Sequence, residues 1–346
     1  MSFARRLTEL LAPLLLVLAT ALLGLAVSSY LQAYFLDTLI KVAIVVGLYV
    51  FIGNSGVISF GQISFVALGV WTAGVLTMPQ SLKRVEMPGL FHFLLTTNVG
   101  NVASLALAAA VGGVAALAVG LPLMRLSGLA AGIATFAVLE ITNNVLTYDG
   151  SVGPGVNNFS AVPATTGIWQ AAIGGMICIV AAYAYQRTRF GRMLRATRED
   201  PAAAAAAGIS VYRQRLLSFT LAGALGGFAG GLYVHLQPLA AGSLYLDLTF
   251  ITLAMLVVGG SGSLLGAVIG ALVLNGIYSF FSAATNTIHV LGWNLSVPSG
   301  TAEVVLGVLM VVVLILRPNG LTGGREFSLP RRRRPVADLE KARATT

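Results

Sequence analysis

The sequence predicts an all-α polytopic membrane protein with about ten transmembrane segments, some of them broken helices, and one short helix in a polar loop. Hydrophobic residues make up 57% of the 346 residues and charged residues only 10%, whereas roughly a quarter of the residues in a soluble domain are charged. Long apolar runs recur from one end of the chain to the other, as in proteins whose helices cross a bilayer several times. The forty glycines are typical of closely packed membrane helices.

Ten apolar segments can be drawn, and glycine-rich breaks at 53–56 and 259–262 divide longer runs. Each break is either a true loop or an unwound point in a discontinuous helix. Several segments are shorter than the ~20 residues that a straight span needs. The first segment follows Arg5 and Arg6, and we expect a retained span because its apolar run exceeds the ~7–15 residues of a signal-peptide core. The ten segments cover residues 10–28, 38–53, 57–77, 102–121, 126–146, 167–186, 216–236, 246–261, 264–284 and 300–317.

The distribution of basic residues predicts which loops face the cytoplasm. If the N-terminus is cytoplasmic and all ten segments cross, only Lys41, Lys83 and Arg84 of the 21 basic residues fall outside. The seven arginines within 187–215 and the arginine run at 331–334 then fall inside, as the positive-inside rule requires. We therefore expect both termini in the cytoplasm.

The chain is expected to divide into a transmembrane domain over 1–322, with a cytoplasmic loop at 187–215, and a polar tail. The tail covers 323–346 and is expected to be unfolded, with its arginines at 331–334 close to anionic lipid. The glycine-rich outer loop at 149–157 suits docking or gating, or is simply a turn.

The polar loop at 187–215 contains a very short helix with both ends marked. Asp200 is a good N-cap, Pro201 suits the first helical position, and Gly208 can adopt the left-handed conformation that ends a helix. Between them lie six alanines. One or two helical turns cannot hold themselves together in water, because nucleation costs more than so few hydrogen bonds return. Another part of the chain or another protein must support this helix.

Small and polar side chains interrupt the apolar sequence at 53–65. Asn54, Ser59, Gln62 and Ser64 each need a hydrogen-bond partner or a wet cavity within a membrane. Two interpretations remain open: these residues join a kinked helix pair, or they line a translocation path.

Glu140 is the most isolated acidic residue within an apolar segment, and Asn143 and Asn144 share its helical face. An acid inside a membrane is either functional or the partner of a neighbouring polar group. His235 is expected to form hydrogen bonds near the membrane surface, and Glu303 to be solvated. Two stripes of glycines spaced by four residues predict close helix packing: Gly223, Gly227 and Gly231, and Gly262, Gly266 and Gly270.

Several function classes are excluded by what the sequence lacks. Cys178 is the single cysteine, so it cannot form a disulfide within the chain, and the three histidines suggest no metal site. No phosphate-binding loop of the GxxxxGK[ST] type and no hydrolase motif occurs, so we expect no enzyme activity in this chain. The arginines border apolar spans and form no single basic face, which argues against nucleic-acid binding.

The order of the motifs resembles the branched-chain amino-acid permeases of the LivM type, which are subunits of ABC importers. The short alanine helix is similar to the cytoplasmic coupling helix of these permeases, whose consensus is Glu-Ala-Ala, three residues and Gly. Here Gly208 fixes the register, and Ala202 replaces the consensus glutamate. The similar stretches are RFGRMLRATREDPAAAAAAGI at 189–209, SFGQ at 59–62, GLYVH at 231–235, VVGGSGSLLG at 257–266 and RPNGL at 317–321.

This resemblance implies a permease in the bacterial inner membrane that imports leucine, isoleucine, valine or a related solute by alternating access. It implies two cytoplasmic ATPases that bind ATP and Mg²⁺, a second permease and an extracytoplasmic binding protein, with no cofactor bound by this chain. The implied ATPase-coupling residues are Arg198, Glu199, Asp200, Pro201, Ala202, Ala203, Ala204 and Gly208. The implied substrate pathway comprises Asn54, Ser59, Gln62, Ser64, Glu140, Asn143, Asn144, Gly259, Gly260 and Gly262.

Three alternatives stay open at the level of the sequence. Related ABC permeases carry urea, short amides or sugars. A secondary transporter would use Glu140 as a proton or cation site and the broken helices as binding elements. A scaffold subunit would have no translocation path, and its uptake activity would not depend on Glu140 or Gln62.

Overall fold

The structure is a computed structural model that describes residues 3–150, 152, 162–239, 244–284, 288–290, 293–295, 298, 300–324 and 326. Most of the predicted tail at 323–346, with the arginine run at 331–334, lies outside these residues. Most of the predicted outer loop at 149–157 also lies outside them.

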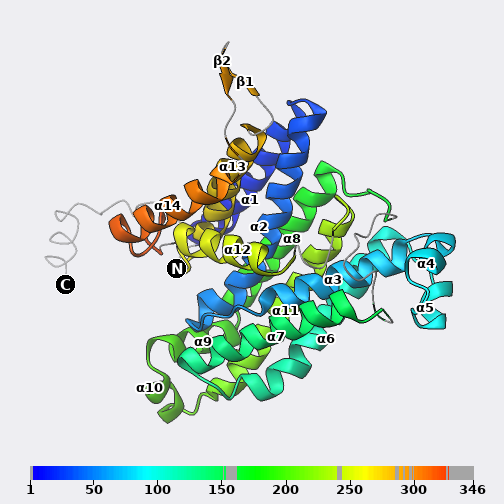
Figure 1. The fold of residues 1–346 in the computed structure, drawn as a ribbon. Coiled ribbons are helices and arrows are strands. Elements are labelled where there is room, and N and C mark those ends of the chain that lie inside the picture. The colour runs from blue at the N-terminus through cyan, green and yellow to red at the C-terminus, as the bar shows by residue number, and fades with distance from the viewer. Residues whose placement is uncertain are drawn as a thin grey trace, which may run out of the picture.

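Each of the ten predicted apolar segments overlaps one helix of the structure, and α1 and α2 begin well before the predicted starts at 10 and 38 (Figure 1). These helices are α1 (Phe3–Leu25), α2 (Ser29–Ser55), α3 (Gln62–Thr77), α6 (Asn101–Leu123), α7 (Gly128–Tyr148), α8 (Ile168–Arg187), α11 (Val211–Val234), α12 (Leu246–Gly259), α13 (Leu264–Ala284) and α14 (Thr301–Leu316). Four shorter helices lie in the connections: α4 (Gln80–Glu86), α5 (His92–Thr96), α9 (Arg189–Glu199) and α10 (Pro201–Ala206). Within the described residues the only strands are β1 (Ile288–Val290) and β2 (Trp293–Leu295), an antiparallel hairpin between α13 and α14.

Seven of the helices are long and apolar enough to cross a membrane: α1, α2, α6, α7, α8, α11 and α13. The remaining apolar helices are α3, α12 and α14, with 16, 14 and 16 residues. At 1.5 Å per residue a 14-residue helix is about 21 Å long, less than the roughly 30 Å of a hydrocarbon core. The polytopic helical class is therefore confirmed, and the number ten stays a prediction.

The buried helices α2 and α11 form the centre of the bundle. Every residue of α2 from Thr38 to Ser55 is buried, as expected for a helix that is apolar on all sides. Helix α11 packs against α2, α3 and α6. A Cβ atom at Gly227 would overlap the backbone carbonyl oxygen of Ala108 in α6. Gly230, which lies beside the predicted stripe, is equally close to the Val66 carbonyl oxygen in α3. The predicted glycine stripe therefore permits close helix contact.

The second glycine stripe lies where α13 crosses α12. A Cβ atom at Gly270 would overlap the Met255 carbonyl oxygen, and one at Gly266 would overlap that of Gly260. The break at 259–262 is thus a tight turn between two helices that lie in close contact.

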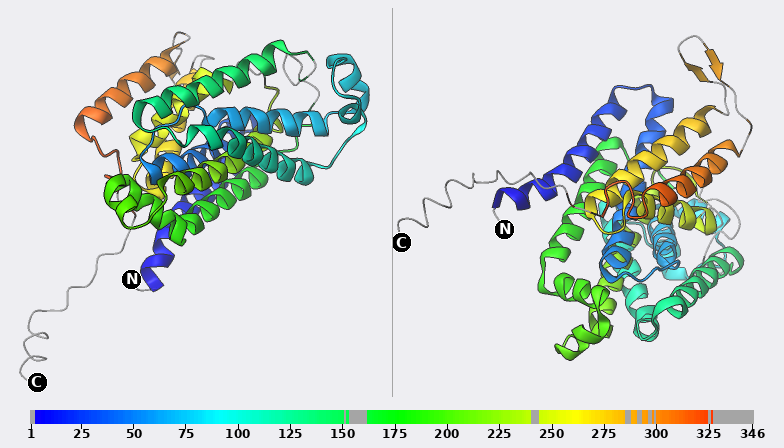
Figure 2. Two further views of the ribbon diagram at one scale, coloured as in Figure 1. Left: turned by 90° about the horizontal axis from the view of Figure 1, so that it is seen from below. Right: turned by 90° about the vertical axis from the view of Figure 1, so that its left-hand side faces the viewer.

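The helix ends gather at two opposite ends of the molecule (Figure 2). At one end, which we call the arginine end, α9 lies near the last turn of α2 and α10 packs against α9, and Arg187 of α8 pairs with Glu9 of α1. Away from the arginine end, α4 and α5 lie at the right of Figure 1, and the β-hairpin projects separately at its top. The loop at 187–215 therefore lies on the same end of the molecule as the start of the chain.

Candidate functional site

The N-terminal end of α10 is capped as the sequence predicts. The Oδ1 atom of Asp200 accepts hydrogen bonds from the backbone N–H groups of Ala202 at 2.9 Å and Ala203 at 3.0 Å. Pro201 occupies the first helical position, where its missing N–H costs nothing. Two donors that a helix start leaves unpaired are therefore satisfied within the chain.

The C-terminal end of α10 is closed by a left-handed glycine, which was also predicted. Gly208 has φ +79°, its N–H donates to the Ala205 oxygen at 2.9 Å, and the Ile209 N–H donates to the Ala204 oxygen at 3.0 Å. This pair of bonds is the Schellman motif. Both ends of a six-residue helix are thus fixed by specific hydrogen bonds.

Helix α10 presents a smooth outer surface. Ala204 is the one buried residue of Pro201–Ala206, and a Cβ atom added at Gly208 would meet nothing within 4 Å. The exposed side chains of the helix are otherwise methyl groups and a proline ring. Such a surface allows a partner to approach nearly to the backbone.

Helix α9 supports α10 and was not recognised as a separate helix from the sequence. The Thr188 hydroxyl accepts the Gly191 N–H at 3.2 Å and caps its start. Leu194 and Thr197 face inward, and the other side chains of α9 are mostly polar. The signal was the amphipathic pattern of 189–199, which breaks at Asp200.

A group of hydrogen bonds joins α9 to the core helix α2. The Arg195 Nε atom donates to Asn54 Oδ1 at 2.8 Å, and the same guanidinium donates to Gln186 Oε1 at 2.5 Å. Gln186 Oε1 also accepts the Tyr49 hydroxyl at 2.8 Å. Asn54, Gln186 and Tyr49 are all buried. We call Tyr49, Asn54, Gln186 and Arg195 the relay cluster.

A second arginine binds the same turn of α2. Arg198 donates to the Gly53 carbonyl oxygen, and a Cβ atom at Gly56, which has φ +71°, would press against the Arg198 side chain. Arg198 and Asn54, expected in the coupling and pathway sets respectively, therefore lie in one structural unit at the arginine end.

Three predicted pathway residues form a buried polar group at the start of α3. Ser59, Gln62 and Ser64 are all at most 2% exposed. Within the described residues, the Ser59 Oγ, Gln62 Nε2 and Ser64 Oγ atoms have no hydrogen-bond partner. The preceding loop is held by α7, because the Phe60 N–H donates to Thr135 Oγ1 at 3.2 Å. Buried polar atoms of this kind need a polar solute, water or a partner group.

Glu140 of α7 is bound from two sides. The Asn144 amide donates to its Oε1 atom at 2.8 Å, and the hydroxyl of Tyr245, just before α12, donates to Oε2. Glu140 and Asn144 therefore share a helical face, as predicted. The Oδ1 atom of Asn143 has no partner among the described residues. Glu140 lies at the surface and links α7 to the beginning of α12.

The predicted break at Gly259, Gly260 and Gly262 is covered by the segment that follows α14. The Leu321 N–H donates to the Val258 oxygen at 2.8 Å, and the Thr322 hydroxyl donates to the Gly259 oxygen at 2.9 Å. The structure places these glycines in a closely packed turn.

Glu326 completes this cover by capping α13. Its carboxylate accepts the Leu264 N–H at 2.7 Å and the Leu265 N–H at 3.4 Å. Burial raises the pKa of Glu326, and the two N–H bonds oppose this shift. The RPNGL motif at 317–321 thus belongs to a clasp around the α12–α13 turn.

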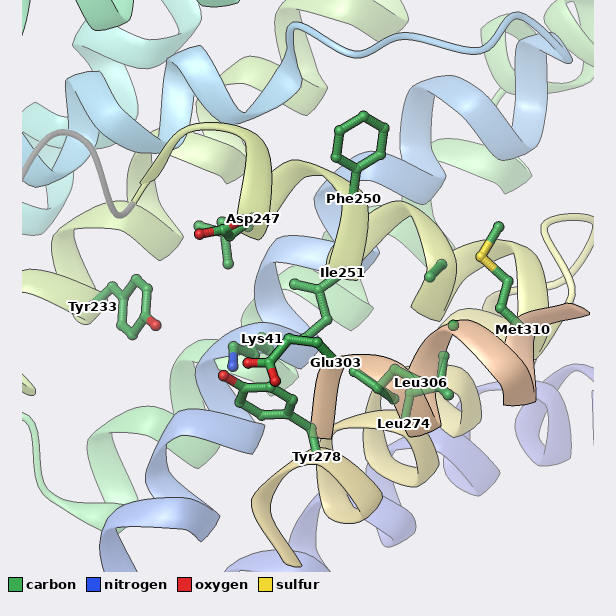
Figure 3. A pocket seen from close by; sticks show the side chains of 13 residues that line it. Lys41, Tyr233, Asp247, Phe250, Ile251, Leu274, Tyr278, Glu303, Leu306 and Met310 are labelled. Carbon is green, nitrogen blue, oxygen red and sulfur yellow. The ribbon is translucent and has the colours of Figure 1, made fainter. Parts of the chain in front are cut away.

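A cavity of about 520 Å³ lies between α2, α11, α12, α13 and α14 (Figure 3). Its polar lining includes Lys41, Tyr233, Asp247, Tyr278 and Glu303, and the rest of the lining is mainly aliphatic. The Lys41 side chain is buried, whereas Asp247 and Glu303 are exposed. The exposed part of the cavity lining therefore includes both acidic residues, together with Phe250 and Gly307.

Sequence reasoning missed this cavity. Charge counting assigned Lys41 to the outer side of the membrane, but this residue of α2 is buried in the bundle and only 5% exposed. Glu303 is exposed, as predicted, and it also lines the cavity. The five polar residues are spread over residues 41–303, so no local motif indicated them. His235 does form the expected hydrogen bonds, to Ser104 and to the Pro163 oxygen.

The described residues contain no group of three metal-ligating side chains. Cys178 is a free thiol buried in α8. The chemistry that these sites offer is hydrogen bonding and charge pairing.

Known proteins similar to this chain are transport permeases. Residues 30–314 match a family model described as "Branched-chain amino acid transport system / permease component". The probable branched-chain amino acid transport permease protein LivH of Methanocaldococcus jannaschii is 35% identical over 144 residues, which cover 40% of this chain and 42% of the relative. The high-affinity branched-chain amino acid transport system permease protein LivM of Salmonella typhimurium is 27% identical over 320 residues, 82% of this chain and 68% of the relative.

Other relatives carry different names. The autoinducer 2 import system permease protein LsrC of Klebsiella pneumoniae is 34% identical over 137 residues, 38% of this chain and 36% of that protein. The match therefore spans less than half the length of the LivH and LsrC relatives. No solved structure matches the chain. Because the family model covers most of the sequence, the chain belongs to the permease family of branched-chain amino acid transport systems.

Proposed function

We propose that this chain is a permease subunit of an ATP-driven importer of branched-chain amino acids or related aliphatic amino acids. The observation that carries the proposal is α10, a doubly capped helix with a bare outer surface that directly follows α9, the helix bonded to the core helix α2. A helix that is fixed so firmly, yet buries only Ala204, is suited to receive a partner and transmit its movement.

In this proposal the arginine end lies in the cytoplasm. Its support is the positive-inside rule, because the end of α8, helix α9 and the start of α11 bring seven arginines to this end. One of the two cytoplasmic ATPase subunits would dock on α10, and both ATPases would bind ATP and Mg²⁺. A second permease would complete the path, and a binding protein would deliver the solute at the opposite end, where α4 and α5 lie. The membrane would be the bacterial inner membrane, with both termini cytoplasmic.

The proposed coupling runs from α10 through α9 into α2. The docking unit consists of the residues from Arg198 to Ala204 and Gly208. The relay cluster connects this unit to the last turn of α2. Movement of α9 would shift the last turn of α2, because the Arg195 and Arg198 bonds hold that turn. A packed core has discrete arrangements, so a small shift at one helix end can change which side of the path is open.

The proposed solute path keeps the residues expected from the sequence and gives them different parts. Ser59, Gln62 and Ser64 would face the passing solute, which is supported by their buried polar atoms without partners among the described residues. Glu140, Asn143 and Asn144 would shape the path through α7. Gly259, Gly260 and Gly262 would allow the α12–α13 turn to move against its clasp.

The proposal is tested by uptake into proteoliposomes that contain the full chain with its ATPases, second permease and binding protein. Ala205→Trp places a large side chain on the exposed surface of α10 and is expected to lower ATP-driven leucine uptake about tenfold or more. Tenfold corresponds to a coupling free energy of about 1.4 kcal/mol. Ala118→Trp is the matched control, because Ala118 is an exposed alanine on α6.

A second variant separates docking from helix stability. Gly208→Asn retains a residue that tolerates the left-handed conformation, so the end of α10 should stay intact. Its side chain projects from the docking unit, so a loss of uptake by this variant reports docking and not the unfolding of α10. Normal uptake by Ala205→Trp at normal membrane levels would refute the coupling role. Leucine uptake that needs no ATPase would refute the importer class.

A further inference from the structure

The cavity between α2, α12, α13 and α14 carries a charge pattern that the coupling scheme does not use. We propose that this cavity is a binding site for an aliphatic amino acid, with the ammonium group at its acidic mouth and the side chain against its apolar wall. The identity of the solute class rests on the proposed function, whereas the charge and shape argument rests on the cavity alone.

The positive charge inside the cavity is already neutralised. Lys41 Nζ donates to Asp37 Oδ2 at 2.7 Å and to Asn275 Oδ1 at 2.9 Å. The Asn275 amide in turn donates to Asp37 Oδ2 at 3.0 Å and to Thr38 Oγ1 at 2.8 Å. These bonds hold the Lys41 side chain in one place. An ammonium group has three donors, so one N–H of Lys41 remains beyond these two bonds.

The negative charges at the mouth are not neutralised in the same way. Asp247 lies in the first turn of α12 and Glu303 in the first turn of α14. Neither carboxylate forms an ion pair within the part of the chain that the structure describes. Glu303 lies beside Tyr278, and the Lys41 amine is 5.2 Å from the centre of the Tyr278 ring (Figure 3). With Lys41 paired to Asp37, the cavity has two spare negative charges and attracts a cationic group.

The remaining lining fits the other two parts of an amino acid. Ile251, Leu274, Leu306 and Met310 offer an aliphatic wall (Figure 3), which suits a branched side chain. The Tyr233 and Tyr278 hydroxyls are already bonded to Asp37 and Glu303. The donor for a carboxylate is therefore the N–H of Lys41 that its two bonds leave over. A volume of about 520 Å³ lies in the range of small-molecule sites, roughly 300–1,000 Å³.

Uncharged solutes fit this lining poorly. A sugar would leave both carboxylates without a cationic partner and would place hydroxyl groups against the aliphatic wall, which is unfavourable without hydrogen bonds. An amine with an aliphatic body matches both surfaces. An aminophospholipid has the same chemistry, and the test must distinguish it from a solute.

The test measures binding of radiolabelled leucine to the full chain assembled with its partner subunits. The complex is placed in phosphatidylcholine nanodiscs, without the binding protein. We expect saturable binding that isoamylamine, which lacks the carboxylate, reduces more strongly than 4-methylpentanoate, which lacks the ammonium group. Glu303→Gln should weaken leucine binding about tenfold, as expected for the loss of a charged hydrogen-bond partner.

Two glycine variants provide a matched pair. A Cβ atom at either Gly307 of α14 or Gly276 of α13 would meet nothing within 4 Å, so neither backbone position by itself excludes a larger side chain. Only Gly307 lines the cavity. Gly307→Leu should therefore abolish leucine binding, and Gly276→Leu should leave it unchanged.

Each outcome decides between the alternatives. Absent saturable binding, equal competition by the amine and the acid, or normal binding by Gly307→Leu would overturn the proposal. Loss of leucine binding when phosphatidylethanolamine is added to the nanodisc would assign the cavity to a lipid amine and overturn it too. Cavity binding in a chain whose uptake needs no ATPase would refute the proposed function alone. ATP-driven leucine uptake without saturable leucine binding to the assembled chain would overturn the cavity assignment alone.

Discussion

Replacing Arg195 by methionine should uncouple ATP hydrolysis from transport while the chain still folds. Methionine keeps most of the length and apolar contact of the arginine stem but removes its guanidinium. The bonds to Asn54 Oδ1 and Gln186 Oε1 are then lost. Gln186 keeps the Tyr49 hydroxyl as a donor, whereas Asn54 Oδ1 loses the donor that the structure gives it.

The expected magnitude follows from the burial of Asn54. Its side chain is 0% exposed, and a buried acceptor without a partner costs about 1–3 kcal/mol. This cost destabilises the arrangement in which α9 is hydrogen-bonded to α2. If no other donor reaches Asn54 Oδ1, the population of this arrangement falls about five- to 150-fold. The Asn54 amide still donates to the Val50 oxygen at 2.9 Å, so the last turn of α2 should remain helical.

The assay compares ATP hydrolysis with leucine uptake in the same proteoliposomes. Arg195→Met should raise the number of ATP molecules hydrolysed per leucine at least fivefold. Arg192→Met is the matched control, because Arg192 is exposed on the same helix and forms no side-chain hydrogen bond among the described residues. A double-mutant cycle with Asn54→Ala should show a coupling energy of about 1 kcal/mol or more. An unchanged ratio in Arg195→Met, or additive effects in the cycle, would refute the relay.

Three further predictions test the packing, the acid of α7 and the terminal clasp. Gly227→Leu should destabilise the helix bundle, since overpacking costs about 1–3 kcal/mol or more. Thermal unfolding in detergent should show a lowered midpoint for this variant, whereas Gly276→Leu should stay near wild type. Glu140→Gln keeps a hydrogen-bonding group, so ATP-driven uptake should fall less than threefold, and complete loss would favour an ion-coupled transporter. The raised pKa of Glu326 means that its protonated form favours the fold, so the stability of the clasp falls as pH rises above 4.5. Exchange at the Leu321 N–H, corrected for its intrinsic rate, should therefore increase with pH in the wild type and stay flat in Glu326→Gln.

The sequence predicted the helical class and the capped helix well because both are encoded locally. Apolar runs mark the ten helices, and Asp200, Pro201 and Gly208 mark the ends of α10 without reference to the rest of the chain. Glycine spacing also indicated the close contacts of α11, although it could not name α3 and α6 as the partners.

The cavity and the relay cluster could not be predicted, because they depend on contacts between distant residues. Arg195 meets Asn54 across 141 positions, and no pattern in either stretch points to the other. Asn54 was assigned to the solute path from its polarity alone, yet its partner is an arginine next to the coupling helix. Lys41 appeared to be an outer cation because charge counting assigns residues to sides and cannot detect a buried ion pair.

The Lys41–Asn275 bond has a consequence for the order of membrane insertion. Asn275 is synthesised 234 residues after Lys41, which takes on the order of ten seconds or more at typical rates of translation. During this time α2 must stay in the bilayer with a lysine in its apolar sequence, at a cost of about 2.5–3.5 kcal/mol if the charge is unpaired at the centre. Asp37, four residues earlier on the same helix, is available from the start and forms the pair at 2.7 Å. Asp37 therefore accompanies Lys41 through biogenesis, and Asn275 joins the pair only when α13 arrives.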